Sequence, residues 1–269
     1  MGAPTHDRPQ IRFRVARVSH RWVAPSAHEQ VYEARLRGCA QSPLVSAPMT
    51  DQPEPYNPLA RVNLGRSVET ALLLQAPLRL TDLNPFTGAG VYAIYYTGDF
   101  AAYAPVSSRD CEVPIYVGKA VPAGARQGKL GLNVDPGRAL FNRLREHERS
   151  IADAENLDVS DFWTRYLVVE DIWIPLGESL LIAHFRPVWN QVLDGFGIHT
   201  PGKGRFGSRR SDWDELHPGR PWYDKMVAHT TPSKLEAKIA SHFEDHPPRR
   251  PEDIPPPTPD DGSQGSTSR

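Results

Sequence analysis

Apolar and polar residues recur along the chain in patterns that predict helices and strands. The first helical stripe is made of Leu64, Val68, Ala71, Leu72 and Gln75. Asn63 is its expected N-cap, and Pro77 ends it. Helices are also expected over residues 138–155 and over residues 176–185, where Pro175 occupies the first helical position.

Runs of β-branched and aromatic residues predict strands over residues 91–97, 113–117 and 163–173. Residues 98–112 are expected to form a long hairpin connection, and the glycine-rich residues 118–137 a loop. The order is therefore strand, strand, helix, strand, helix. This order predicts an α+β fold (a small α/β unit) with a mostly antiparallel sheet.

The two ends of the chain differ from this patterned middle. Residues 1–48 are rich in arginine and show little periodicity, and one interpretation takes Met49 as the true start. Near the other end, Ser233 and Glu236 have the spacing of a capping box that opens a short helix. Residues 246–269 are rich in Pro, Asp and Ser and are expected to be disordered, because they offer too little apolar surface to offset the entropy of ordering.

Composition narrows the class of protein only slightly. A chain of 269 residues is long enough to bury a substantial core, and its net charge of −1 requires any nucleic-acid-binding surface to be local. Cys39 and Cys111 are the only cysteines, which is too few for a disulfide framework and favours a reducing cytoplasm. The chain has neither a long apolar run nor the apolar core of a signal peptide, so we expect a cytoplasmic protein.

Two short strand segments carry the most specific chemical signal. Tyr92 ends the sequence Gly-Val-Tyr, and Tyr116 begins the sequence Tyr-Val-Gly. Each tyrosine taken alone is most simply a strand aromatic that packs. Adjacent strands would bring the two hydroxyls together. Because a phenol of pKa about 10 is a poor base, it needs nearby positive charge or a histidine that takes its proton.

Four residues further along the chain supply partners for such a pair. Arg143 and His147 share one face of the expected helix, although His147 also suits a buried core position. Glu178 lies among apolar residues near a helix start, where a carboxylate is costly unless it binds a cation or a metal. Its ordinary interpretation is a carboxylate stabilised by the helix dipole. Asn190 follows that helix, and its ordinary interpretation is a turn residue.

Together these residues resemble the GIY-YIG nuclease superfamily, with valine in place of isoleucine in both signatures. The Arg143-x-x-x-His147 pair and the spacing of Glu178 and Asn190 resemble the type II restriction endonuclease branch, and within it the enzymes that cut CCGCGG. The resemblance implies an endonuclease domain over residues 53–245 with its core at about 88–192. The connection between the two signatures is longer than in most of the superfamily.

The resemblance also implies a mechanism. Glu178 would hold one Mg²⁺, Arg143 would stabilise the transition state, and Tyr116 and Asn190 would position phosphate oxygens. Tyr92, assisted by His147, would position or deprotonate the attacking water, and Lys119 is a rival base or a phosphate contact. A palindromic site implies a homodimer, and a restriction enzyme implies a cognate DNA methyltransferase as functional partner.

A basic segment offers candidate DNA contacts. Residues 195–211 contain no acidic residue but contain Lys203, Arg205, Arg209 and Arg210, which suit either phosphate binding or a solvated loop. The Gly202–Gly207 match to a dinucleotide fingerprint lacks the preceding strand and is rejected. Two alternatives stay open: a GIY-YIG repair or homing nuclease, and a non-catalytic DNA-binding protein on the same fold.

Overall fold

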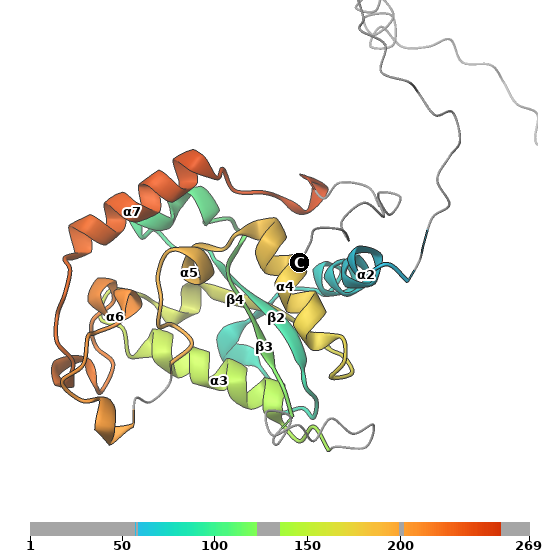
Figure 1. Cartoon of the computed structure of the whole chain (residues 1–269), viewed down its shortest axis with the longest axis horizontal. Coiled ribbons are helices and arrows are strands. Elements are labelled where there is room, and N and C mark those ends of the chain that lie inside the picture. Colours follow the sequence, from blue (N-terminus) through green and yellow to red (C-terminus); the bar gives the residue numbers. More distant parts are fainter. Residues whose placement is uncertain (1–56, 58, 123–134, 199–201, 254–269) are drawn as a thin grey trace, which may run out of the picture. The chain divides into compact units, whose positions relative to one another are not determined.

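The computed structural model describes residue 57 and residues 59–122, 135–198 and 202–253, without the side chain of Lys203. The chain divides into two compact units, Met1–Gln52 and Pro53–Arg269, and every described residue belongs to the second. The expected N-terminal extension, residues 1–48, therefore lies outside the described residues. Element labels follow Figure 1.

A four-stranded sheet forms the centre of the second unit. Its strands are β1 (Leu78–Arg79), β2 (Gly90–Tyr96), β3 (Pro114–Ala120) and β4 (Phe162–Val168), in the order β1-β4-β2-β3. Every pair is antiparallel, so the predicted fold class is confirmed. β1 was not predicted, because two residues are too few to show a period. β3 continues to Ala120, into the expected loop, and β4 ends five residues earlier than expected, at Val168 rather than residue 173.

Helices cover both faces of the sheet. The α-helices are α2 (Arg61–Leu73), α3 (Ala139–Ala152), α4 (Ile174–Phe185), α5 (Val188–Gln191), α6 (Asp212–Leu216) and α7 (Pro232–Asp245). Short 3-10 turns are η1 (Leu80–Asp82), η2 (Ala101–Val106), η4 (Val159–Asp161), η5 (Lys203–Arg205), η6 (Tyr223–Lys225) and η7 (Pro251–Asp253). Among the described residues, no helix has the length and apolar character needed to cross a bilayer.

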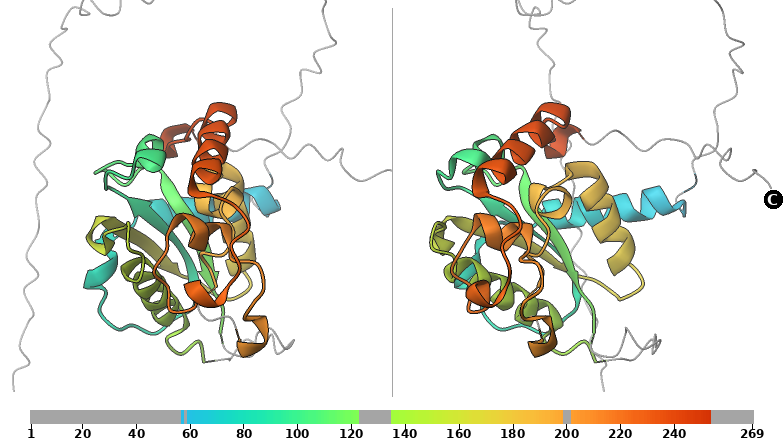
Figure 2. Two further views of the ribbon diagram at one scale, coloured as in Figure 1. Left: turned by 90° about the vertical axis from the view of Figure 1, so that its left-hand side faces the viewer. Right: turned by 60° about the vertical axis from the view of Figure 1, so that its left-hand side comes forward.

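The buried side chains form two cores on opposite faces of β2. Tyr92, Ile94 and Tyr96 pack in one core with residues of α3, α5, α6 and α7. Val91, Ala93 and Tyr95 pack in the other with residues of α2 and α4. In the left view of Figure 2 the orange segment containing α6 lies in front of the sheet and α2 lies behind it. All seven residues of β2 are buried, so this strand lies at the centre of the unit, between the two cores.

Both predicted helix caps are wrong. α2 and α7 begin at Arg61 and Pro232, so Asn63 and Ser233 lie inside the first turn, and the actual N-cap residues make no side-chain cap hydrogen bond. The Asn63 amide instead donates to the carbonyl of Asn57 at 2.7 Å. A residue two positions inside a helix can reach back to the preceding loop, which a spacing rule does not distinguish from a cap.

The first residues of the expected disordered tail contact the folded unit. Residues 246–253 are part of the described structure and contain η7. Arg250 forms an ion pair with Glu112 at 3.5 Å, and Arg249 donates to the carbonyl of His184 at 3.5 Å. These two arginines connect a proline-rich segment to the folded unit by polar contacts that composition does not reveal. The remaining tail lies outside the described residues.

Glu69 generates a prediction about stability and pH. Its side chain on α2 is 3% exposed, and burial raises the carboxyl pKa from 4.5 to about 7, against the opposing effect of Arg66. The folded state therefore holds this proton more tightly than the unfolded state, and stability is lost as the pH rises from about 4.5 to about 7. Glu69→Gln should be more stable than the parent at pH 8 by ~1–3 kcal/mol, and this gap should close near pH 4.5.

Urea unfolding of both proteins across this pH range measures the effect. Glu244→Gln, which changes an exposed glutamate on α7, is the matched control and should show a small gap that stays constant. A Glu69→Gln gap that does not vary with pH would contradict the explanation.

Candidate active site

The two tyrosine signatures contact each other through Tyr92 and Gly118. They lie directly opposite each other in the antiparallel pairing of β2 and β3. A Cβ atom on residue 118 would lie 2.4 Å from the Tyr92 hydroxyl and 2.5 Å from its Cζ atom. Tyr92 is fully buried, so its ring has no room to move away. The glycine of the second signature is therefore required for the position of the tyrosine of the first.

The Tyr92 hydroxyl is hydrogen bonded to His147 of α3. The distance from the hydroxyl to Nε2 is 2.6 Å, and both side chains are fully buried. The Tyr116 ring lies 6.2 Å from that of Tyr92 and 5.2 Å from that of His147, measured between centroids. The structure thus brings together three residues that the sequence analysis selected from three different elements.

Both phenols are neutral at physiological pH. Burial raises the pKa of Tyr92 well above its usual value, and the neighbouring Tyr116 raises it further. Burial likewise raises the pKa of Tyr116. Arg143 opposes both shifts without reversing them. A tyrosine can act as a base if it is already ionised or if a histidine takes its proton. The environment disfavours ionised Tyr92 and places His147 at hydrogen-bond distance from it.

Arg143 lies beside the tyrosines, one helical turn from His147. One Nη atom donates to the carbonyl of Gly197 at 3.1 Å, and the other lies 3.4 Å from the carboxylate of Glu146. Its side chain is 26% exposed. This guanidinium is therefore held at one end by a backbone carbonyl while it stays accessible to a ligand.

Glu178 and Lys119 form an ion pair on the other side of β3. The Glu178 carboxylate on α4 lies 2.5 Å from the Lys119 ammonium group, and the two side chains are 18% and 40% exposed. Lys119 points to the same face as Val117, which packs in the core with α2 and α4. Beside the larger effect of burial, the charge of Glu178 also raises the pKa of Tyr116 and of Tyr92, so its charge acts on the phenols.

Asn190 binds backbone. Its side-chain oxygen accepts a hydrogen bond from the Val117 N–H, and its nitrogen donates to the Val117 carbonyl, both at 2.8 Å. β3 is an edge strand, and Val117 lies between Tyr116 and Gly118. Asn190 thus pairs the free edge of this strand as a neighbouring strand would. The expected phosphate contact of Asn190 stays a prediction, and the structure adds a positioning contact.

A comparison with family models identifies the relatives of this site. The model described as the Eco29kI GIY-YIG domain, from a restriction endonuclease family, matches residues 84–243. The chain belongs to this family. The match includes every predicted catalytic residue, from Tyr92 to Asn190. A comparison with curated proteins gives no match.

The basic segment of this Eco29kI-family protein is only partly available to DNA. Arg205 and Arg209 are exposed, and Arg209 forms an ion pair with Asp212 at 2.9 Å. Arg210 is 8% exposed, pairs with Glu215 at 2.9 Å and lies 3.6 Å above the ring of Tyr223. Because its guanidinium is bound inside the protein, these contacts do not support the predicted DNA contact of Arg210, which stays a prediction. The side chain of Lys203 lies outside the described structure.

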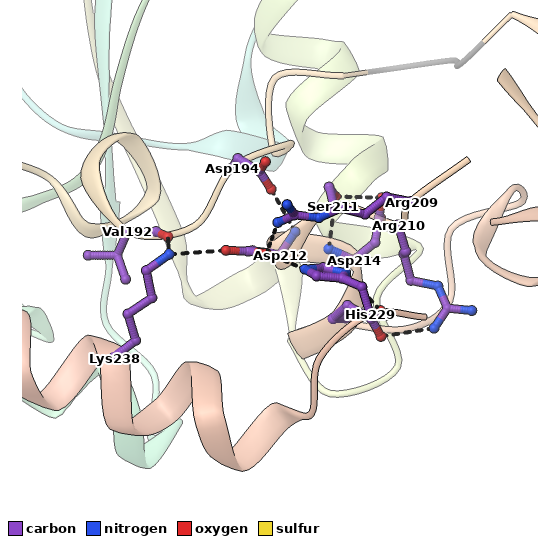
Figure 3. Close-up of polar contacts among 10 residues, drawn as sticks. Val192, Asp194, Arg209, Arg210, Ser211, Asp212, Asp214, His229 and Lys238 are labelled. Atoms are coloured by element: carbon purple, nitrogen blue, oxygen red, sulfur yellow. Dashed lines mark hydrogen bonds and ion pairs between the residues drawn. The ribbon is translucent and has the colours of Figure 1, made fainter. Parts of the chain in front are cut away.

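Asp212 is the centre of the polar network beside this segment. It accepts hydrogen bonds from Arg209, from His229 and from Lys238 of α7 (Figure 3). Lys238 also donates to the carbonyl of Val192 at 2.7 Å. The network fixes residues 209–212 against α7 and against the residues that follow α5. The basic segment is consequently anchored at its C-terminal end. A solvated loop was one of two interpretations of this segment from its sequence, and these contacts hold its end in place.

Phe196 is a site residue to which the sequence analysis gave no role. Its ring stacks on that of His147, with centroids 4.5 Å apart and planes at 16°. It also meets the Tyr116 ring edge-on at 4.8 Å. The only sequence signal is the glycine on each side of Phe196, which indicates an unusual backbone without indicating its place. Gly195 has φ +94°, a conformation that other residues rarely adopt.

Gly118→Ala tests the geometry of the tyrosine pair. The added methyl group should displace Tyr92 from His147 and lower the DNA-cleavage rate by ~100-fold or more, as misplacement of a catalytic group by about 1 Å does. Gly98→Ala is the matched control, because its Cβ would lie 2.5 Å from the hydroxyl of Tyr96, outside the site. We expect Gly118→Ala and Gly98→Ala to lose similar thermal stability, and Gly118→Ala to lose much more cleavage activity. Equal activity in both variants would refute the required contact.

Proposed function

We propose that this protein is a Mg²⁺-dependent type II restriction endonuclease that cuts duplex DNA at a short GC-rich palindrome, CCGCGG, as a homodimer. The observation that carries the proposal is the convergence of Tyr92, His147 and Arg143 beside β3, with Glu178 close enough to act on the same phenols. Membership of a restriction endonuclease family supports it. A cognate methyltransferase would protect the same site in the host.

Glu178 fits a magnesium ion. The described residues contain no cluster of three or more His, Cys, Asp or Glu side chains suited to a metal. Mg²⁺ typically uses only one or two protein carboxylates and fills its other positions with water and phosphate oxygens. When bound, the ion would neutralise charge on the phosphate and on the leaving oxygen. The Lys119 ammonium shows that the Glu178 carboxylate already attracts a cation.

The Tyr92–His147 pair provides a route for the proton of the attacking water. As Tyr92 takes a proton from water, its own proton passes to Nε2 of His147, 2.6 Å away. Tyr92 is then a neutral phenol again, His147 is an imidazolium with a proton on each ring nitrogen, and the hydroxide formed from the water attacks phosphorus. This relay requires the tautomer in which Nε2 is the acceptor and Nδ1 holds the proton.

Arg143 and Tyr116 would bind the phosphate on the exposed side of this pair. Arg143 supplies positive charge where the pentavalent transition state accumulates negative charge. Tyr116 is neutral and can donate its hydroxyl proton to a phosphate oxygen. The ion pair with Glu178 uses Lys119 as a cation, which favours a phosphate contact over a role as base.

Arg205 and Arg209 are the candidates for contacts with the DNA bases or backbone. Both are exposed and belong to the segment that adjoins the site. An arginine can form two hydrogen bonds with guanine in the major groove, which suits a GC-rich target. A palindrome presents the same contacts twice, related by a two-fold axis, and each GIY-YIG site cuts one strand. A symmetric dimer therefore explains a double-strand cut.

Incubation of plasmid DNA with purified protein tests this proposal. Discrete fragments are expected with Mg²⁺ and none with a chelator, and end mapping should place the cuts within CCGCGG. Glu178→Gln should abolish cutting, because an amide does not replace the anionic ligand, while DNA binding remains. Smeared or nicked DNA would favour repair or homing chemistry, and intact DNA would favour the non-catalytic alternative. Unchanged cutting by Glu178→Gln would refute the metal assignment.

A double-mutant cycle tests the proton relay. Tyr92→Phe and His147→Ala should each slow cleavage ~10²–10⁴-fold, the usual contribution of a general base, and the double variant should be little slower than either single one. Non-additivity is expected because the two groups act in one step. Lys119→Met should have a smaller effect that depends on salt concentration. A Lys119→Met loss that exceeds that of Tyr92→Phe would assign the base to Lys119.

A further inference from the structure

Residues 195–198 form one wall of the active site and are held between two arginines. On the inner side, the carbonyl of Gly197 accepts a hydrogen bond from Arg143 at 3.1 Å, and Phe196 stacks on His147. On the outer side, the carbonyls of Gly195, Phe196 and Ile198 all accept hydrogen bonds from Arg220, at 3.2, 3.3 and 2.9 Å. Neighbouring carbonyls of one short segment thus accept hydrogen bonds from two different guanidinium groups.

Arg220 is itself firmly held. It is 2% exposed, its Nε atom lies 3.4 Å from the carboxylate of Asp214, and its guanidinium lies 3.9 Å from the Trp213 ring centroid. Burial lowers its pKa to about 10, with Asp214 opposing the shift, so the side chain stays charged at neutral pH. A charge buried this deeply is costly unless its hydrogen bonds are used, and three of them are used on this wall.

Apart from Arg220, the outer contacts of the wall lie at its start. A Cβ atom on residue 195 would lie 2.1 Å from Cβ of Ser211, so the start of the wall already touches the residue that caps α6. Asp194, immediately before it, accepts hydrogen bonds from the N–H groups of Asp212 and Trp213. At the other end, the hydrogen bond of the Ile198 N–H in the described structure stays within the wall, to the carbonyl of Gly195 at 3.0 Å. Arg220 is its polar support at that end.

We propose that Arg220 is a positioning residue that holds Arg143 and His147 in their catalytic geometry through residues 195–198, a role that rests on the proposed nuclease function. Loss of Arg220 removes a donor from all three carbonyls, of which that of Gly195 keeps the N–H of Ile198, and releases the wall from its outer side. Arg143 then loses a fixed partner, and the ring that confines His147 shifts. Arg143 would contact a single phosphate, whereas most of the DNA affinity comes from the exposed basic residues, so the chemical step is affected much more than binding.

The test compares Arg220→Lys and Arg220→Gln with Arg165→Gln. Arg165 is the matched control, because it also donates to two backbone carbonyls, those of Gln75 and Cys111, and stacks on a tyrosine, but lies away from the site. Single-turnover cleavage at saturating DNA, DNA affinity without Mg²⁺ and thermal stability are measured for each. Both Arg220 variants should cleave at least ~10-fold more slowly per folded molecule, with affinity within ~3-fold of the parent. Arg165→Gln should cleave at the parent rate.

Three results would separate the outcomes. The positioning role would be overturned if Arg220→Lys cleaved at the parent rate. It would also be overturned if every variant lost cleavage rate only in proportion to its unfolded fraction. If the Arg220 variants do not fold, Asp214→Asn, which keeps the arginine but removes its ion-pair partner, should slow cleavage in the same direction, and an unchanged rate would refute the proposal. Failure of the parent protein to cut any DNA would instead refute the nuclease function.

Discussion

The 2.6 Å hydrogen bond between Tyr92 and His147 is the interaction on which the chemistry of this site depends. It joins a strand to a helix inside a core where neither side chain meets solvent. Residue 118 must have no side chain for this bond to form, because a Cβ atom there would lie only 2.4 Å from the Tyr92 hydroxyl. The paired signatures are therefore two halves of one packing constraint, and the Tyr92 hydroxyl is positioned by a glycine on the neighbouring strand.

β3 brings the two halves of the site together because both of its faces are used. Tyr116 and Gly118 face His147 of α3, whereas Lys119 meets Glu178 of α4 on the other face. In phosphoryl transfer the attacking and leaving oxygens lie roughly in line on opposite sides of phosphorus. A phosphate at the edge of β3 would have the Tyr92–His147 pair, proposed to activate water, on one side and Glu178, proposed to hold the metal, on the other. Asn190 keeps that edge in place by pairing with Val117.

Much of the fold and of the inner site follows from local sequence. Alternation and helical spacing identify three of the four strands and the helices that carry His147 and Glu178, because each of these elements buries a regular stripe. The contacts between distant residues could not be predicted in the same way. Arg210 looks like a DNA contact by charge alone, yet Glu215 and Tyr223 bind it inside the protein. Phe196 and Arg220 carry no motif, and their roles depend on how residues 195–198 fold against α3.

The tautomer of His147 tests the proton relay most directly. Nitrogen NMR spectra of the protein labelled with ¹⁵N-histidine, recorded at neutral pH, report which ring nitrogen carries the proton. The proton relay requires that Nε2 is unprotonated and accepts the hydrogen bond from Tyr92, with the proton on Nδ1. Gly118→Ala should remove the ¹⁵N signals of this hydrogen-bonded tautomer. A protonated Nε2 that donates to Tyr92 would contradict the relay, because His147 could not then accept the proton that Tyr92 must release.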